Sequence, residues 1–134
     1  MSLAESVRQR AGNRCQYCLM HQGLQGATFH IEHVIPSSRG GTDGLANLAL
    51  VCPGCNLRKS DRTTAVDPAT GKKVALFRPN EQSWFDHFRL DGFLIRGVTG
   101  TGRATVVALE LNHLRRQRIR AVEHSFGLFP PPQA

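Results

Sequence analysis

Residues 52–60 read CPGCNLRKS, a Cys-x-x-Cys pair followed directly by Asn56 and, two residues on, by two basic residues. Such a pair occurs in redox motifs, as half of a zinc site, and by chance. A second pair, Cys15 and Cys18, precedes it, and residues 19–51 separate the two. Two pairs are the usual ligand spacing of a tetrahedral Cys₄ zinc site, whereas a redox pair would need a βαβ unit that the sequence does not indicate.

We therefore predict one structural Zn²⁺ held by four thiolates. The ligands are Cys15, Cys18, Cys52 and Cys55. Four cysteines close the coordination shell, so this ion takes no part in chemistry. It would hold an N-terminal knuckle against the start of a helix, and we expect Gly54 to help the second turn close. Asn56, one residue past a ligand, would then be fixed in place.

The chain is strongly basic, with 17 Lys and Arg against 10 Asp and Glu, a net charge of +7 and a pI near 10.1. Most of the cations are arginines, whose planar guanidinium suits bidentate contact with phosphate. A polyanion is therefore a plausible partner, although an ordinary basic surface would show the same composition.

A length of 134 residues and a hydrophobic share of 40% indicate one globular domain. No apolar run approaches the roughly 20 residues of a membrane span, and the N-terminal stretch lacks the apolar centre of a signal peptide. We expect a cytoplasmic protein with no membrane contact, a compartment in which disulfides are rare.

Hydrophobic periodicity predicts a helix over 3–11, strands over 27–35 and 48–52, a Gly-rich loop over 36–47, and a short helix from residue 54. These elements make up the metal-bearing part of the chain, at 12–63, together with the helix before it.

The rest of the chain, 64–134, is expected to extend the same single domain. It predicts a hairpin over 66–77, an amphipathic segment over 80–90 and a strand over 92–100. One helix should follow over 101–126, or two helices with Asn112 as the cap of the second, before a tail at 129–134.

The segments EHVIP, GG, NL, CPGCN and RK occur in this order between the two cysteine pairs and just past them. In their spacing, residues 12–63 resemble the HNH endonucleases, in the form flanked by cysteines. The resemblance implies an α+β fold with a ββα-metal (His-Me finger) core, a Cys₄ zinc knuckle and a C-terminal hairpin-plus-helix extension. The extension also resembles that of small bacterial HNH proteins, with Pro79-Asn80 where Pro-Arg is more usual.

The resemblance assigns catalytic roles residue by residue. His33 matches the general base, whose ordinary pKa lies near neutrality, and Asn47 matches the asparagine that fixes the loop and orients the base. Glu32 and Asn56 match the metal-binding pair, and an amide where other members have His favours Mg²⁺ or Mn²⁺ over Zn²⁺. Glu32 and His33 leave opposite faces of a regular strand, so both reach one site only if the strand ends or distorts there. His30 faces with Glu32, and its role is left open.

Candidate phosphate contacts are spread over the loop and two helices. They are Arg39, Arg58, Lys59, Arg115, Arg116, Arg118 and Arg120. The run at 115–120 suits a helix that follows a DNA backbone, and its alternative is a solvated helix face.

Three hypotheses follow from these observations. The first is a metal-dependent DNA endonuclease that nicks duplex DNA with weak sequence specificity, because nothing in the sequence indicates a base-reading helix. The second is a catalytically inactive, zinc-stabilised nucleic-acid-binding module, and the third is a zinc-stabilised scaffold for protein partners. We expect a monomer, with Val107, Leu111 and Leu114 packed on the aromatic residues of 80–90.

Overall fold

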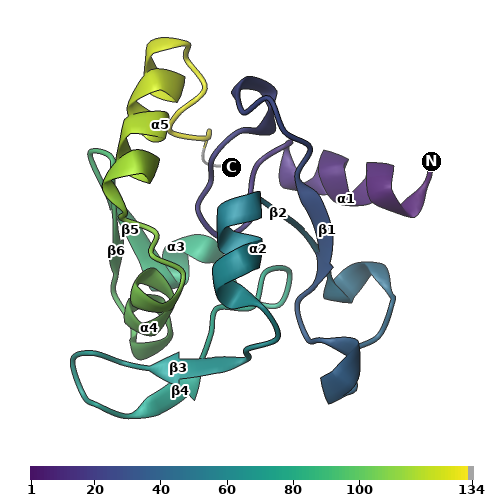
Figure 1. The fold of residues 1–134 in the computed structure, drawn as a ribbon, viewed down its shortest axis with the longest axis vertical. Coiled ribbons are helices and arrows are strands. Elements are labelled where there is room, and N and C mark those ends of the chain that lie inside the picture. Colours follow the sequence, from purple (N-terminus) through teal and green to yellow (C-terminus); the bar gives the residue numbers. More distant parts are fainter. Residues whose placement is uncertain (133–134) are drawn as a thin grey trace.

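The structure is a computed structural model that describes residues 1–132, so the end of the expected tail lies outside the described residues. Figure 1 shows the arrangement, with α2 at the centre of the view, the hairpin β1–β2 and α1 to one side, and the extension to the other. The elements are α1 (Leu3–Ala11), β1 (His30–His33), β2 (Leu48–Val51), α2 (Pro53–Lys59), β3 (Thr64–Val66), β4 (Lys73–Ala75), α3 (Trp84–His87), β5 (Phe88–Asp91), β6 (Leu94–Gly97), α4 (Gly100–Ala108) and α5 (Leu114–Ser125). The expected α+β class is confirmed.

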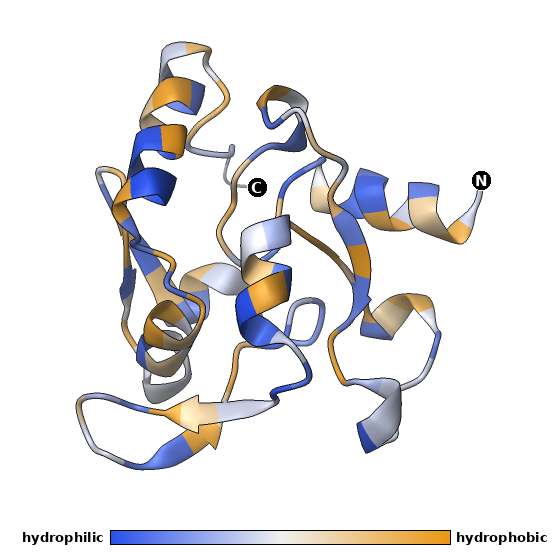
Figure 2. Cartoon of the chain, viewed as in Figure 1, coloured by the Kyte–Doolittle hydropathy of each residue, from blue (hydrophilic) through white to orange (hydrophobic). Residues whose placement is uncertain are grey.

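The centre of the fold is an antiparallel hairpin followed by a helix. His30 lies opposite Val51 and His33 opposite Leu48. All four residues of β2 are buried, whereas β1 is only partly buried, and Figure 2 shows β1 as mostly hydrophilic. A half-covered strand of this kind leaves polar side chains at the surface. The strand β1 is shorter than the predicted 27–35, because pairing stops at His33.

The helix α1 begins and ends as its sequence predicts. The hydroxyl of Ser2 accepts a hydrogen bond from the Glu5 N–H at 3.1 Å, and Gly12 closes the helix with φ of 62°. Val7 is fully buried, and the Arg10 guanidinium donates to the carbonyls of residues 45 and 48. These contacts hold α1 against the start of β2.

The extension contains two hairpins, β3–β4 and β5–β6, with α4 packed on β6. Gly102 permits this packing, because a Cβ atom there would lie 2.0 Å from the carbonyl oxygen of His87. The C-terminal region forms two helices, α4 and α5, separated near Asn112 as one of the alternatives proposed. The predicted cap is wrong, however: the Asn112 amide pairs with the backbone of Ile95, and the ring of His113 caps α5.

The two parts of the chain share one cluster of buried apolar residues. Phe77 packs edge-on against both Tyr17 and Phe88, and the indole N–H of Trp84 donates to the Tyr17 carbonyl at 2.9 Å. Aromatic side chains of the extension therefore pack directly on the knuckle that carries the first cysteine pair.

The expected apolar face of the C-terminal helices is only partly covered. Leu111 is fully buried, but Val107 and Leu114 are 58% and 55% exposed, so the prediction that all three are packed is wrong for two of them. The reason is the break between α4 and α5: Val107 lies on α4, Leu111 between the helices and Leu114 on α5, so the three do not share one helix face. Within residues 1–132, no helix combines the length and apolar character that crossing a membrane requires.

Candidate metal centre and active site

The four cysteines come together in the interior. Their Sγ atoms all lie within 4.8 Å of one another, and the Sγ atoms of Cys18 and Cys52 are 3.7 Å apart. A disulfide would need about 2.05 Å. Ligands at about 2.3 Å from a tetrahedral Zn²⁺ lie about 3.8 Å from each other, so the cluster fits a structural zinc ion.

Each cysteine pair lies on a turn of defined geometry. In the first knuckle the Cys15 N–H donates to the Met20 carbonyl, the Leu19 N–H donates to the Cys15 carbonyl, and Leu19 adopts φ of 66°. In the second, Cys52 precedes α2, and Pro53 occupies the first turn, where no N–H is needed. The end of β2 and the start of α2 are thereby joined at the cluster, and Asn56 follows on the next turn of the helix.

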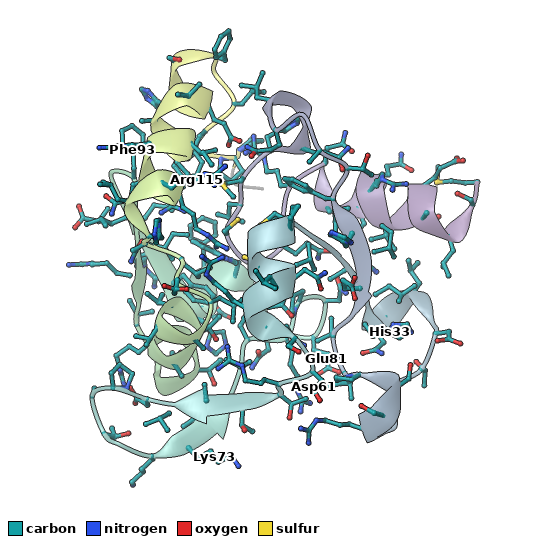
Figure 3. The ribbon with its side chains drawn as sticks, in the orientation of Figure 1. His33, Asp61, Lys73, Glu81, Phe93 and Arg115 are labelled. Carbon is teal, nitrogen blue, oxygen red and sulfur yellow. The ribbon has the colours of Figure 1, made fainter. Side chains whose placement is uncertain are left out.

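Glu32, His33 and Asn56 line the same pocket between β1 and α2. The strand ends at His33, so the side chains of two consecutive residues both reach this pocket. Figure 3 shows His33 and Asp61, which also line the pocket, in the same region of the molecule. A carboxylate, an amide oxygen and an imidazole in one open pocket provide ligands for a hard cation and a base for a proton.

Asp43 is a partner of His33 that the sequence did not indicate. His33 Nε2 and Asp43 Oδ1 are 2.7 Å apart, and their side chains are 33% and 91% exposed. A carboxylate on one ring nitrogen favours the tautomer in which that nitrogen carries the proton, which leaves the other nitrogen as the acceptor. The signal available in the sequence was the acidic residue in the Gly-rich loop.

Asn47 holds the loop that carries Asp43. Its Oδ1 accepts from the Ile35 N–H at 2.9 Å, and its Nδ2 donates to the carbonyls of Ile35 at 3.0 Å and Thr42 at 2.8 Å. Gly41 allows the loop to pass this close, because a Cβ atom there would lie 1.7 Å from the Ile35 oxygen. The loop and the end of β1 are therefore joined by one side chain.

Lys59 turns inward instead of facing solvent. It is 6% exposed, lines the pocket with Glu32, and donates from Nζ to the Val34 carbonyl at 3.0 Å. Burial lowers the pKa of its ammonium, while the nearby carboxylates of Glu32 and Asp61 oppose that shift. Its expected role as a phosphate contact stays a prediction, and any such contact would have to be made inside the pocket, because the side chain is buried there.

The other basic residues near the site divide into paired and exposed groups. Arg58 donates to the Glu110 carboxylate and to the Gly54 carbonyl, so its charge is already matched. Beside that guanidinium, the pKa of Glu110 is lowered.

Arg39 is exposed and donates from Nε to the Asp61 carbonyl at 3.0 Å. His30 is exposed and lies 3.8 Å from Glu32, outside the residues that line the pocket.

The arginines of α5 do not form one surface. Arg115 and Arg118 are exposed, but Arg116 and Arg120 are 5% and 0% exposed. The prediction that the second pair contacts nucleic acid is therefore wrong. The guanidinium of Arg120 donates to the carbonyls of Phe93 and Leu111, which joins α5 to the β5–β6 turn and to the end of α4.

A hairpin, a crossing helix and a polar pocket between them are the elements of the ββα-metal class of nuclease domains. The family model described as HNH endonuclease matches residues 15–62, the part of the chain that carries the motifs, so this segment is similar to the HNH endonucleases. No curated protein and no solved structure gave a match to the chain.

Proposed function

We propose that this chain is a metal-dependent endonuclease that hydrolyses phosphodiester bonds in DNA. The observation that supports this most directly is the pocket shared by Glu32, His33 and Asn56, at the junction that the Cys₄ cluster holds together. A scaffold for protein partners would have no use for an acid, a base and an amide in one pocket.

In the proposed mechanism His33 removes a proton from the attacking water, and Asp43 and Asn47 keep its ring and loop in position. Glu32 and Asn56 would hold one Mg²⁺ or Mn²⁺, whose charge would stabilise the phosphate and the leaving oxygen. Lys59 adds a positive charge beside Glu32 and neutralises part of the carboxylate field before the ion binds.

One base and one metal site can cut only one strand in each encounter. We therefore propose that a monomer nicks duplex DNA, with residues 1–134 acting as a single domain. We assign the phosphate contacts to three exposed side chains, those of Arg39, Arg115 and Arg118. Figure 3 shows Arg115 and His33 on opposite sides of α2 in this view. Contacts to phosphate carry no sequence information, and cleavage is expected to be weakly specific.

A supercoiled-plasmid assay with Mg²⁺, Mn²⁺ or EDTA tests the proposal. The wild type should give open circles first and linear DNA later, only with a divalent ion. His33→Ala should abolish cleavage and keep DNA affinity. His124→Ala, exposed on α5 and outside the residues that line the pocket, is the matched control and should cut normally.

Each other outcome points to a different error. Normal cutting by His33→Ala would mean that the base is misassigned. Linear DNA from the outset would mean that the working unit is a dimer. DNA binding without cleavage, with every divalent ion tried, would favour the inactive binding module.

A further inference from the structure

One arginine of the extension reaches the cysteine cluster. Arg116 Nη1 donates to Cys55 Sγ at 3.1 Å, and the side chain is buried together with all four cysteines. Residue 116 lies on α5, well outside the 15–62 segment that the family model covers. The metal centre is therefore not confined to the segment that supplies its ligands.

The charge of the centre explains why a cation is placed there. Four thiolates and one Zn²⁺ carry a net charge of −2, and a buried charge is costly unless it is paired and hydrogen-bonded. The guanidinium of Arg116 supplies one positive charge and a donor in direct contact with sulfur. Arg120 is also buried near the cysteines, but its hydrogen bonds run from Nε and Nη2 to backbone carbonyls, so among the described residues it makes none to sulfur.

Gly54 makes room for this arginine. A Cβ atom on Gly54 would lie 2.5 Å from Arg116 Nη2, closer than atoms approach. The same Nη2 is buried and has no hydrogen-bond partner among the described residues. The bond to Cys55 is therefore the hydrogen bond that this guanidinium makes within residues 1–132. Gly54, a helical residue in α2, thus serves the packing of Arg116 and not the closing of a turn.

We propose that Arg116 is an outer-shell component of the zinc centre, through which the C-terminal extension controls how firmly the ion is held. Its hydrogen bond lowers the electron density on the Cys55 sulfur, and its charge offsets the net charge of the centre. This proposal rests on the structural zinc ion and not on the proposed nuclease activity.

Zinc release to a competing chelator, followed with a colorimetric indicator, is the test. Outer-shell substitutions typically lower metal affinity by about 10- to 100-fold, and Arg116→Met should fall in that range. Arg116→Lys keeps the positive charge but has a compact ammonium in place of the planar guanidinium. Its zinc release should therefore be intermediate between those of the wild type and Arg116→Met. Arg118→Met, exposed on the same helix, is the matched control and should release zinc like the wild type.

Gly54→Ala keeps every ligand and the arginine itself. Alanine is the better helix former, so without the contact with Arg116 the substitution would be expected to stabilise α2. The proposal expects faster zinc release, because the methyl group displaces the guanidinium. Gly54→Ala also decides the matter if Arg116→Met fails to fold.

Thiol reactivity gives a second measurement. With limiting iodoacetamide, Cys55 should become the first alkylated cysteine in Arg116→Met, as read by peptide mapping, whereas the Arg118→Met pattern should match the wild type. Wild-type zinc release in both Arg116→Lys and Gly54→Ala, with an unchanged alkylation order, would overturn the proposal.

Discussion

The side chain of Asn47 and the backbone of Ile35 form a two-point clamp, in which the amide oxygen accepts from the Ile35 N–H at 2.9 Å and the amide nitrogen donates to the Ile35 oxygen at 3.0 Å. The clamp joins the loop after β1 to the turn before β2. It places Asp43 beside His33, with only a loop and a short 3-10 helix, Ser37–Arg39, between them in the chain.

Asn47→Ala removes the hydrogen-bond partners of the partly buried Ile35 backbone and of the exposed Thr42 carbonyl. We expect a loss of about 1–3 kcal/mol in the free energy of unfolding and a fall in cleavage rate, because the loop no longer holds Asp43. Urea denaturation and plasmid cleavage measure the two effects. Asn47→Asp should be nearly as damaging, since a carboxylate cannot donate to the Ile35 and Thr42 carbonyls. Unchanged stability in both variants would contradict the clamp.

Glu32→Ala and Asn56→Ala should each raise the Mg²⁺ or Mn²⁺ concentration needed for half-maximal cleavage. Asn56→His should keep the site but shift its preference toward Ni²⁺ or Zn²⁺, since imidazole suits softer ions. Leu57→Ala, which lines the pocket from the same helix but offers no ligand atom, controls for changes in α2 and in the shape of the pocket. An unchanged metal profile in Asn56→His would show that this side chain is not a ligand.

Loss of zinc should unfold the N-terminal part of the chain. Binding to a structural zinc site is worth about 10–16 kcal/mol, as much as the roughly 5–15 kcal/mol that holds a whole domain together. Purified protein should contain one Zn²⁺, and Cys52→Ala should lose it together with the near-ultraviolet circular dichroism of Tyr17 and Trp84. A zinc-free sample with full thermal stability would refute the site.

The ion pair between Asp67 and Arg103 makes the free energy of unfolding depend on pH in the acid range. Hydrogen bonds from Arg103 hold the pKa of Asp67 well below its ordinary 3.8. A group whose pKa is lowered by folding stabilises the protein above its unfolded pKa, and the stabilisation is lost as pH falls through the folded pKa. The wild type should therefore be more stable than Asp67→Asn at neutral pH, with the difference shrinking below pH 3.8.

Urea unfolding at several pH values checks this expectation. Asp91→Asn, exposed at the end of β5 and without an ion pair among residues 1–132, is the control and should show no such convergence. If the difference in free energy of unfolding between wild type and Asp67→Asn stays constant down to the most acid pH, the ion pair does not cause the loss of stability in acid.

The exposed arginines of α5 should govern DNA affinity. Replacing Arg115 and Arg118 by Ala should weaken binding uniformly across sequences and reduce the slope of log K against log salt concentration by about one for each phosphate that is no longer neutralised. Fluorescence anisotropy at several salt concentrations measures the slope. Replacing Arg116 and Arg120 should destabilise the fold instead, because both are buried. An unchanged salt slope in the variant that lacks Arg115 and Arg118 would mean that DNA does not bind along α5.

The sequence by itself determined the elements that depend on local spacing. The two Cys-x-x-Cys pairs, the capped helix at 3–11 and the alternation around Glu32 and His33 each involve residues a few positions apart, where φ, ψ and ligand geometry leave little choice. The motif order then predicted which residues of the hairpin and helix would meet, and the common pocket of Glu32, His33 and Asn56 agrees with it.

Only the tertiary structure decided which charges are internal. Arginine and lysine in a helix are usually solvated, and the run at 115–120 carries no local signal that two of its members point inward. Arg116 is buried because a distant thiolate cluster offers it a negative partner, and Lys59 because Val34 and Glu32 offer it an acceptor and a charge. The contact of Asp43 with His33 likewise depends on the path of a loop that Asn47 and Gly41 define together. Burial of a charge is decided by its partner, and that partner lies far away in the sequence.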